Sequence, residues 1–88
     1  MTIYKKALIK FGIFTQQLKL VEEMAELTKE IIKISNDDLT KAKFKQTISN
    51  IEEEIADVSI VLEQIKSSYS GWKQHEERKL KRLEEMVK

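Results

Sequence analysis

The residues best suited to chemistry in this chain are two pairs of carboxylates. Glu23 and Glu26 are three residues apart, and Glu54 and Asp57 repeat that spacing further along. Side chains at this spacing on a helix project from the same face, so the members of each pair can reach a common point. Carboxylates brought together in a partly dry place repel unless they are neutralised or protonated. A hard divalent cation neutralises them, and Mg²⁺ suits oxygen ligands better than zinc does.

The position of Glu54 on its predicted helix separates it from an ordinary surface glutamate. It falls within an apolar stripe, with Asp57 at the stripe's edge, and the apolar members are Ile51, Val58, Val61 and Ile65. In the first pair, Glu23 lies beside a line of Leu20, Leu27 and Ile34, whereas Glu26 points nearer the polar sector. The alternative is a solvated charged face, because glutamates paired with lysines four residues on are common on helices. The place of Glu54 within the stripe argues against that alternative.

The elements that carry these pairs are predicted to be helices, because the chain has no proline and only two glycines. We expect a first helix over residues 2–11 with Thr2 as its N-cap, an interruption at Gly12, and a second helix over 13–35. Residues 36–38 are predicted to form a loop, and residues 39–47 fit a loop, a short helix or the first turns of the next helix. Ser49 and Glu52 have the spacing of a capping box and predict the start of a helix that runs to about residue 68. A last helix is expected over about 72–87.

Length and composition favour one all-α domain, a helical bundle of three or four helices per subunit. A chain of 88 residues buries a modest core when it folds alone, so we expect an oligomer. A net charge of +1 provides no general attraction to nucleic acid or to an anionic membrane. The absence of cysteine excludes disulfides and thiolate metal sites. No apolar run approaches the roughly 20 residues that span a bilayer, and no signal-peptide core is present, so we expect a cytoplasmic protein.

The order and spacing of the two acidic motifs resemble those of a known superfamily. Residues 22–26 read E-E-x-x-E and residues 53–57 read E-E-x-x-D. Together with the flanking stretches FGIFTQQLKLVEEMAEL, IEEEIADVSIVLEQI and KLKRLEE, they resemble the all-α nucleotide pyrophosphohydrolases, which include MazG, the dimeric dUTPases and the dCTP pyrophosphatases. The resemblance covers most of residues 1–88 as a single MazG-like domain.

This resemblance implies a reaction, a cofactor and an assembly. It assigns Glu23, Glu26, Glu54 and Asp57 as ligands of Mg²⁺, or of Mn²⁺ in its place. The implied reaction hydrolyses a nucleoside triphosphate between its α and β phosphates, giving a monophosphate and pyrophosphate. A carboxylate that the metal does not saturate, Glu22 or Glu26, is the candidate acceptor of the water's proton. The resemblance also implies a homodimer or homotetramer in which partner helices complete the nucleotide pocket.

Three further residues have two interpretations each. Lys79 and Arg82 are candidates for contacting substrate phosphate, or else they form an ordinary charged helix end. Trp72 is a candidate for stacking on a base, although a single tryptophan is more often a packing anchor.

Two rival functions also stay open. One is a non-catalytic helical interaction protein, adaptor or antitoxin-like, with solvated acidic faces; the other is a nucleic-acid-binding module that uses the lysines, which the near-zero net charge argues against.

Overall fold

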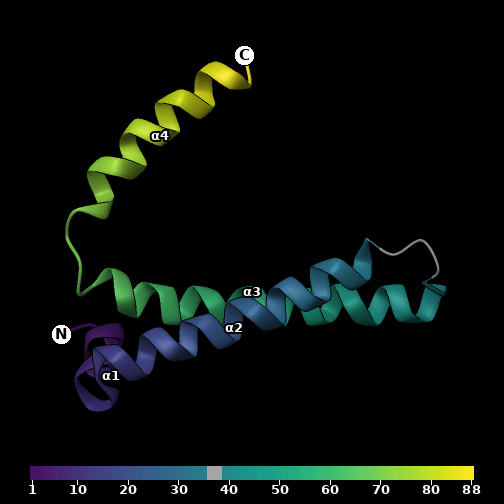
Figure 1. Cartoon of the computed structure of the whole chain (residues 1–88), viewed down its shortest axis with the longest axis horizontal. Coiled ribbons are helices and arrows are strands. Elements are labelled where there is room, and N and C mark those ends of the chain that lie inside the picture. Colours follow the sequence, from purple (N-terminus) through teal and green to yellow (C-terminus); the bar gives the residue numbers. More distant parts are fainter. Residues whose placement is uncertain (36–38) are drawn as a thin grey trace.

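The computed structural model describes residues 1–35 and 39–88, and within these ranges the chain is all-helical, as predicted. The helices are α1 (Ile3–Phe11), α2 (Ile13–Ile34), α3 (Lys41–Lys66) and α4 (Trp72–Met86). Helices α2 and α3 form a long antiparallel hairpin, and α1 packs against the end where α2 begins and α3 finishes (Figure 1). Helix α4 leaves this end at a steep angle and extends away from the hairpin.

The boundary between α1 and α2 is a single glycine. Thr2 caps α1 by accepting a hydrogen bond from the Lys5 backbone nitrogen at 3.2 Å, and the Gly12 nitrogen closes the helix on the Leu8 carbonyl at 2.8 Å. Gly12 has φ 88° and ψ 150°, a conformation that is essentially restricted to glycine. The predicted cap at Thr2 and the predicted interruption at Gly12 are therefore both confirmed.

The start of α3 differs from the capping-box prediction, which is wrong. Thr40 is the N-cap, and its hydroxyl accepts a hydrogen bond from the Lys43 nitrogen at 3.3 Å, whereas Ser49 lies inside the helix. Most of the ambiguous 39–47 segment thus forms the first turns of α3. The physical reason is that Phe44 and Ile48 continue the apolar spacing of the later helix, so the hydrophobic period extends past the local capping signal. The loop predicted at 36–38 lies outside the described residues.

One chain buries very little apolar surface. Among the described residues, Val61 is the single buried hydrophobic side chain, while Gln16, Thr47 and Gln64 are buried polar ones. Most of the protein's large apolar side chains are at least partly exposed. No helix in the described part of the chain is long and apolar enough to cross a membrane. The contact between α2 and α3 is the main interface among the described helices, and polar residues outnumber apolar ones among the buried side chains on these two helices.

Candidate metal centre

Polar side chains recur every seven residues along the contact between α2 and α3. Seven residues are close to two helical turns, so such side chains stay on one face. Because the two helices are antiparallel, each step of seven along α2 is matched by a step of seven back along α3. The result is three polar layers, which we call the glutamine layer (Gln16 and Gln64), the acidic layer (Glu23, Glu54 and Asp57) and the Glu30–Asn50 layer.

The two flanking layers are hydrogen-bonded. In the glutamine layer, Gln16 Nε2 donates to Gln64 Oε1 at 2.6 Å, with both residues buried. At the other end, Asn50 Nδ2 donates to Glu30 Oε2 at 3.4 Å, and Lys33 Nζ lies 3.2 Å from Glu30 Oε1. Burial acts to raise the pKa of Glu30, but the hydrogen bonds from Lys33 and Asn50 and the lysine charges outweigh it, so this pKa is lowered. Each flanking layer therefore satisfies its own polar groups.

The acidic layer between them contains no such donor. Glu23 from α2 and Glu54 and Asp57 from α3 each place a carboxylate oxygen within 4.8 Å of the other two, and all three residues are half-buried. The Oε2 atoms of Glu23 and Glu54 are shielded from solvent and have no hydrogen-bond partner. An unpartnered buried carboxylate oxygen is costly. The acidic layer thus lacks the positive charges or hydrogen-bond donors that its carboxylates need, whereas the polar groups of the two flanking layers have their partners.

The lack of donors and positive charge around the acidic layer raises the pKa of Glu54. Burial raises the pKa of its carboxyl group from 4.5 to about 7, and the nearby carboxylates of Glu26, Glu23 and Asp57 add to the effect. At neutral pH the Glu54 carboxyl group is thus protonated about half of the time, which lowers the negative charge of the layer. A proton in this position is replaceable by a cation.

The spacing of the three oxygens fits a small hard cation. Mg²⁺ binds oxygens at about 2.1 Å, so ligands on opposite sides of the ion are about 4.2 Å apart. Among three ligands at most one pair can be opposite, and the other pairs are neighbours about 3.0 Å apart. Oxygens that lie within 4.8 Å of one another reach these distances by side-chain rotation. All three donors are carboxylates, the type that Mg²⁺ and Mn²⁺ prefer, and the remaining positions stay available to water or phosphate oxygens. The residues present therefore fit the implied metal.

Glu26, the fourth predicted ligand, and Glu22, the other candidate proton acceptor, lie at different places on α2. Glu26 is exposed and lies outside the group of three, but its charge acts on Glu54, so it borders the acidic layer. Glu22 is also exposed and lines a separate hollow of about 460 Å³ with Thr15 and Gln16. The structure thus brings together three of the four predicted metal ligands and leaves Glu26 beside them.

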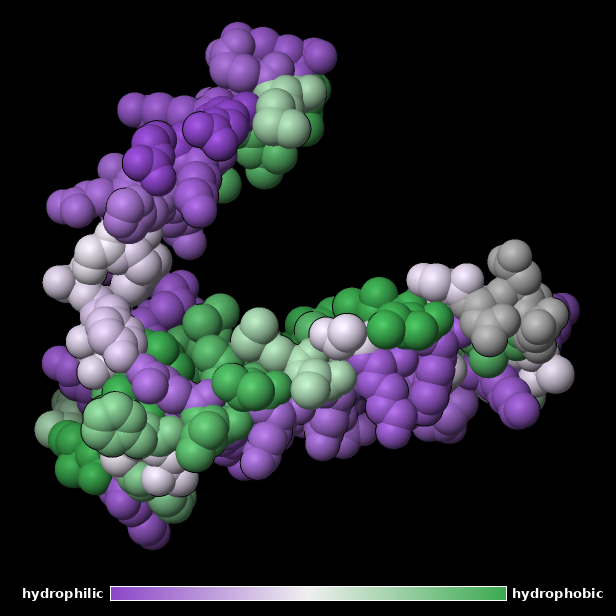
Figure 2. All heavy atoms as spheres, viewed as in Figure 1, coloured by the Kyte–Doolittle hydropathy of each residue, from purple (hydrophilic) through white to green (hydrophobic). Residues whose placement is uncertain are grey.

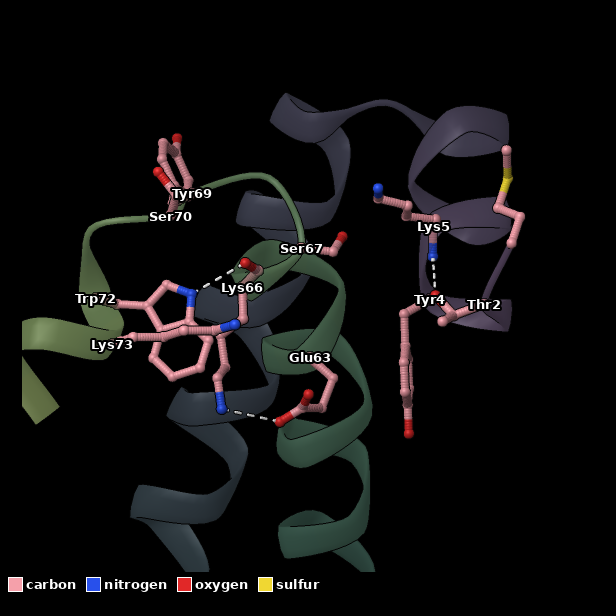
Figure 3. A pocket seen from close by; sticks show the side chains of 11 residues that line it. Thr2, Tyr4, Lys5, Glu63, Lys66, Ser67, Tyr69, Ser70, Trp72 and Lys73 are labelled. Atoms are coloured by element: carbon pink, nitrogen blue, oxygen red, sulfur yellow. Dashed lines mark hydrogen bonds and ion pairs between the residues drawn. The ribbon is translucent and has the colours of Figure 1, made fainter. Parts of the chain in front are cut away.

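Trp72 lies at the joint between α3 and α4, in a hollow of about 830 Å³ that opens toward the start of α1 (Figure 3). Its Nε1 donates to the Lys66 carbonyl at 3.0 Å, and Lys66 Nζ lies 4.1 Å from the ring centroid. Lys66 also pairs with Glu63 at 3.1 Å. Along α3, Lys66 is about 14 Å from Asp57 at 1.5 Å per residue. These contacts are those of a packing anchor, and in the single chain the ring lies well away from the acidic layer.

Lys79 and Arg82 are both exposed on α4. Lys79 lines a hollow of about 840 Å³ between the end of α3 and α4, with Leu62 and Leu83 among its neighbours. Because α4 diverges from the hairpin that carries the acidic layer, neither basic residue joins that layer within one chain (Figure 1). Any contact with a phosphate at the acidic layer would have to come from another copy.

The glutamine layer and the Glu30–Asn50 layer were missed by sequence reasoning. The signal that reveals them is a seven-residue spacing, which relates Gln16 to Glu23 and Glu30 and relates Asn50 to Asp57 and Gln64. Comparison with known protein families, with curated proteins and with solved structures finds no match to this chain.

Proposed function

We propose that this protein is a Mg²⁺-dependent nucleoside triphosphate pyrophosphohydrolase that cleaves between the α and β phosphates. The observation that carries the proposal is the acidic layer, which holds three converging carboxylates and two solvent-shielded oxygens without partners. The resemblance of the two acidic motifs to those of the all-α pyrophosphohydrolases supplies the reaction. In this proposal Glu23, Glu54 and Asp57 hold the cation, and Glu26 borders the layer without ligating it.

The flanking layers support such a site by holding the two helices together. Three carboxylates that lie close together repel one another, which opposes the packing of α2 on α3 at that point. The hydrogen bonds of Gln16 to Gln64 and of Asn50 to Glu30 lie on either side and oppose that separation. The ligands are thus positioned by rigid helices, which favours a defined coordination geometry.

The chain's own residues can also serve the hydrolysis. A bound Mg²⁺ would screen the phosphate charge and orient the triphosphate for attack. Water attacks the α phosphorus, the bond to the bridging oxygen breaks, and pyrophosphate leaves. Glu26 is exposed and borders the layer, so it is the better placed of the two candidates to accept the water's proton, ahead of Glu22.

The test is pyrophosphate release from a panel of canonical and modified ribo- and deoxyribonucleoside triphosphates, with and without Mg²⁺. Glu54→Gln is the informative variant, and Glu53→Gln is its matched control because Glu53 is the exposed neighbour on the same helix. We expect metal-dependent release by the wild type and by Glu53→Gln, and loss of release in Glu54→Gln. No release from any nucleotide by folded wild-type protein would contradict the proposal.

Glu26→Gln separates the proton acceptor from the ligands. Removal of a group that takes part in proton transfer typically lowers turnover by about 10²–10⁴-fold. We expect Glu26→Gln to retain Mg²⁺ binding and to lose most of its turnover. Unchanged turnover would remove Glu26 from the mechanism and leave Glu22 as the candidate.

The exposed apolar surface favours a second candidate, a non-catalytic helical interaction protein. The half-buried acidic layer speaks against the version in which these acids are solvated. Thermal melting with and without millimolar Mg²⁺ distinguishes the two candidates, because a ligand that binds only the folded state raises its stability. We propose in either case that the working form is a homodimer or homotetramer, since one chain buries so little apolar surface.

A further inference from the structure

Three lysines from three different helices line the hollow beside Trp72. This hollow of about 830 Å³ lies where the start of α1 meets the end of α3 and the start of α4. Its lysines are Lys5 from α1, Lys66 from α3 and Lys73 from α4, and we call it the joint hollow. A volume of this size is typical of sites that bind small molecules.

The joint hollow carries an excess of positive charge. Among the described residues that line it, Glu63 is the single acid, and its carboxylate lies 3.1 Å from Lys66 Nζ. Lys5 and Lys73 are both exposed, so their charges remain available to a ligand. The surrounding chain adds to the excess, because residues 1–21 contain four lysines and no acid. These charges favour an anion as the ligand.

Two of the lysines occupy unfavourable positions in their own helices. The N-terminus of a helix carries a partial positive charge, so the first turn favours an acid and disfavours a lysine. Lys5 lies in the first turn of α1 and Lys73 in the first turn of α4, and neither turn contains an acid. An anion in the hollow between them would offset both lysine charges, and the two helix ends would add to the attraction.

Trp72 holds two of the ammonium groups at one wall of the joint hollow. Lys66 Nζ lies 4.1 Å and Lys73 Nζ lies 5.6 Å from the centroid of its ring, so both cations lie over the indole. Figure 3 shows Lys5 on the opposite side of the hollow, with Glu63 between the two walls. An anion that contacts both walls must therefore carry negative charge at more than one centre.

The surface around the joint hollow favours a polar ligand over an apolar one. Figure 2 shows the joint between α3 and α4 as a weakly hydrophilic band with strongly hydrophilic residues beside it. Because lysines cover the indole of Trp72, a stacked aromatic ring is not the ligand that these contacts favour. Lysine ammonium groups are common ligands of phosphate groups in proteins.

We propose that the joint hollow binds a diphosphate group without a metal ion. Two linked phosphates can contact Lys66 and Lys73 at one wall and Lys5 at the other, whereas orthophosphate has a single charged centre. The group can come from free pyrophosphate or from the diphosphate of a nucleotide. The hollow is separate from the acidic layer, since Lys66 is about 14 Å from Asp57 along α3. The proposed hydrolase releases pyrophosphate, but this inference does not rest on that reaction.

The experiment is isothermal titration calorimetry of the full chain with pyrophosphate in EDTA, which keeps the acidic layer free of metal. Trp72 is the only tryptophan, so its fluorescence reports whether binding occurs at the joint hollow. Lys5→Gln and Lys73→Gln each remove one lysine from the hollow. Lys6→Gln and Lys81→Gln are their matched controls, because these exposed lysines lie on the same two helices and do not line the hollow.

We expect pyrophosphate to bind and to change the fluorescence of Trp72. Lys5→Gln and Lys73→Gln should each weaken binding by about tenfold or more, because each removes a charge-assisted hydrogen bond, and the controls should bind as the wild type does. Orthophosphate at equal ionic strength should bind at least about tenfold more weakly. Comparison of pyrophosphate with a nucleoside diphosphate identifies the source of the group, since the tighter of the two is the better ligand.

The absence of heat and of a fluorescence change at millimolar pyrophosphate would overturn the proposal. Binding that either Lys5→Gln or Lys73→Gln leaves unchanged would also overturn it, because the anion would then not contact both walls. Orthophosphate that binds as tightly as pyrophosphate would show a general attraction of charge instead. Circular dichroism of each variant checks that the helices are intact. Because neither metal nor turnover enters the measurement, failure of this proposal and failure of the hydrolase proposal are distinguishable.

Discussion

Protonation of Glu54 should compete with cation binding at the acidic layer. The pKa of this carboxyl group is raised to about 7, so half of the metal-free protein carries the proton at neutral pH. A cation binds the carboxylate form, and the apparent affinity therefore falls as the protonated fraction grows. One competing proton with this pKa weakens Mg²⁺ binding by about tenfold between pH 8 and pH 6, with most of the change below pH 7.

Isothermal titration calorimetry of metal-free protein with Mg²⁺ at pH 6, 7 and 8 measures this competition. Titrations in buffers of different ionisation enthalpy also count the released protons, which we expect to be about 0.9 at pH 6 and about 0.1 at pH 8. Glu53→Gln should keep the wild-type profile, because Glu53 is exposed beside the layer. Equal affinity at pH 6 and pH 8, or an unchanged pH dependence in Glu54→Gln, would refute the role assigned to Glu54.

Three further outcomes follow from the fold. In EDTA, the melting temperature should fall as pH rises from about 5 to 7 and then level off. The reason is that the pKa of Glu54 is raised from 4.5 to about 7 by folding, so over this range the folded state binds more protons than the unfolded state. A melting temperature that rises over that range would contradict this. Gln16→Leu should cost about 1–3 kcal/mol in urea unfolding because Gln64 is left buried without its partner, whereas the double variant Gln16→Leu/Gln64→Leu should recover most of that loss. Gly12→Ala should cost about 1–3 kcal/mol through backbone strain alone, since a Cβ at φ 88° meets no atom within 4 Å, and an unchanged urea midpoint would show that the turn relaxes.

The helices were predictable because their signals are local. The N-cap at Thr2 is predictable because a threonine hydroxyl can accept a hydrogen bond from the first turn of a helix. The break at Gly12 is predictable because glycine readily adopts a positive φ. The error at Ser49 arose because two capping signals compete in the chain, and the choice between them depends on packing. Phe44 and Ile48 extend the apolar period of α3, so the helix starts at the earlier signal, Thr40.

The acidic pairs were predictable as pairs, but their membership in one layer depends on register. Spacing places Glu54 with Asp57 and Glu23 with Glu26 on their own helices. Which of them meet is decided by how α2 slides and rotates against α3, and that contact brings Glu23 inward while Glu26 stays exposed. The helical wheel of α2 indicates that Glu23 is nearer the apolar side than Glu26 is. It does not show which residues of α3 they face.

The polar layers also explain how one register is chosen. Apolar helices can slide past one another with little change in energy, whereas a buried polar pair that loses its partner is penalised. The bond between Gln16 and Gln64 and that between Asn50 and Glu30 are satisfied together in a single register, and that register necessarily places Glu23 against Asp57. The repulsion in the acidic layer is therefore imposed by its neighbours. A site that is unfavourable when empty and is held in place by satisfied layers on both sides is expected to bind a cation strongly, because the cation relieves repulsion without any rearrangement of the helices.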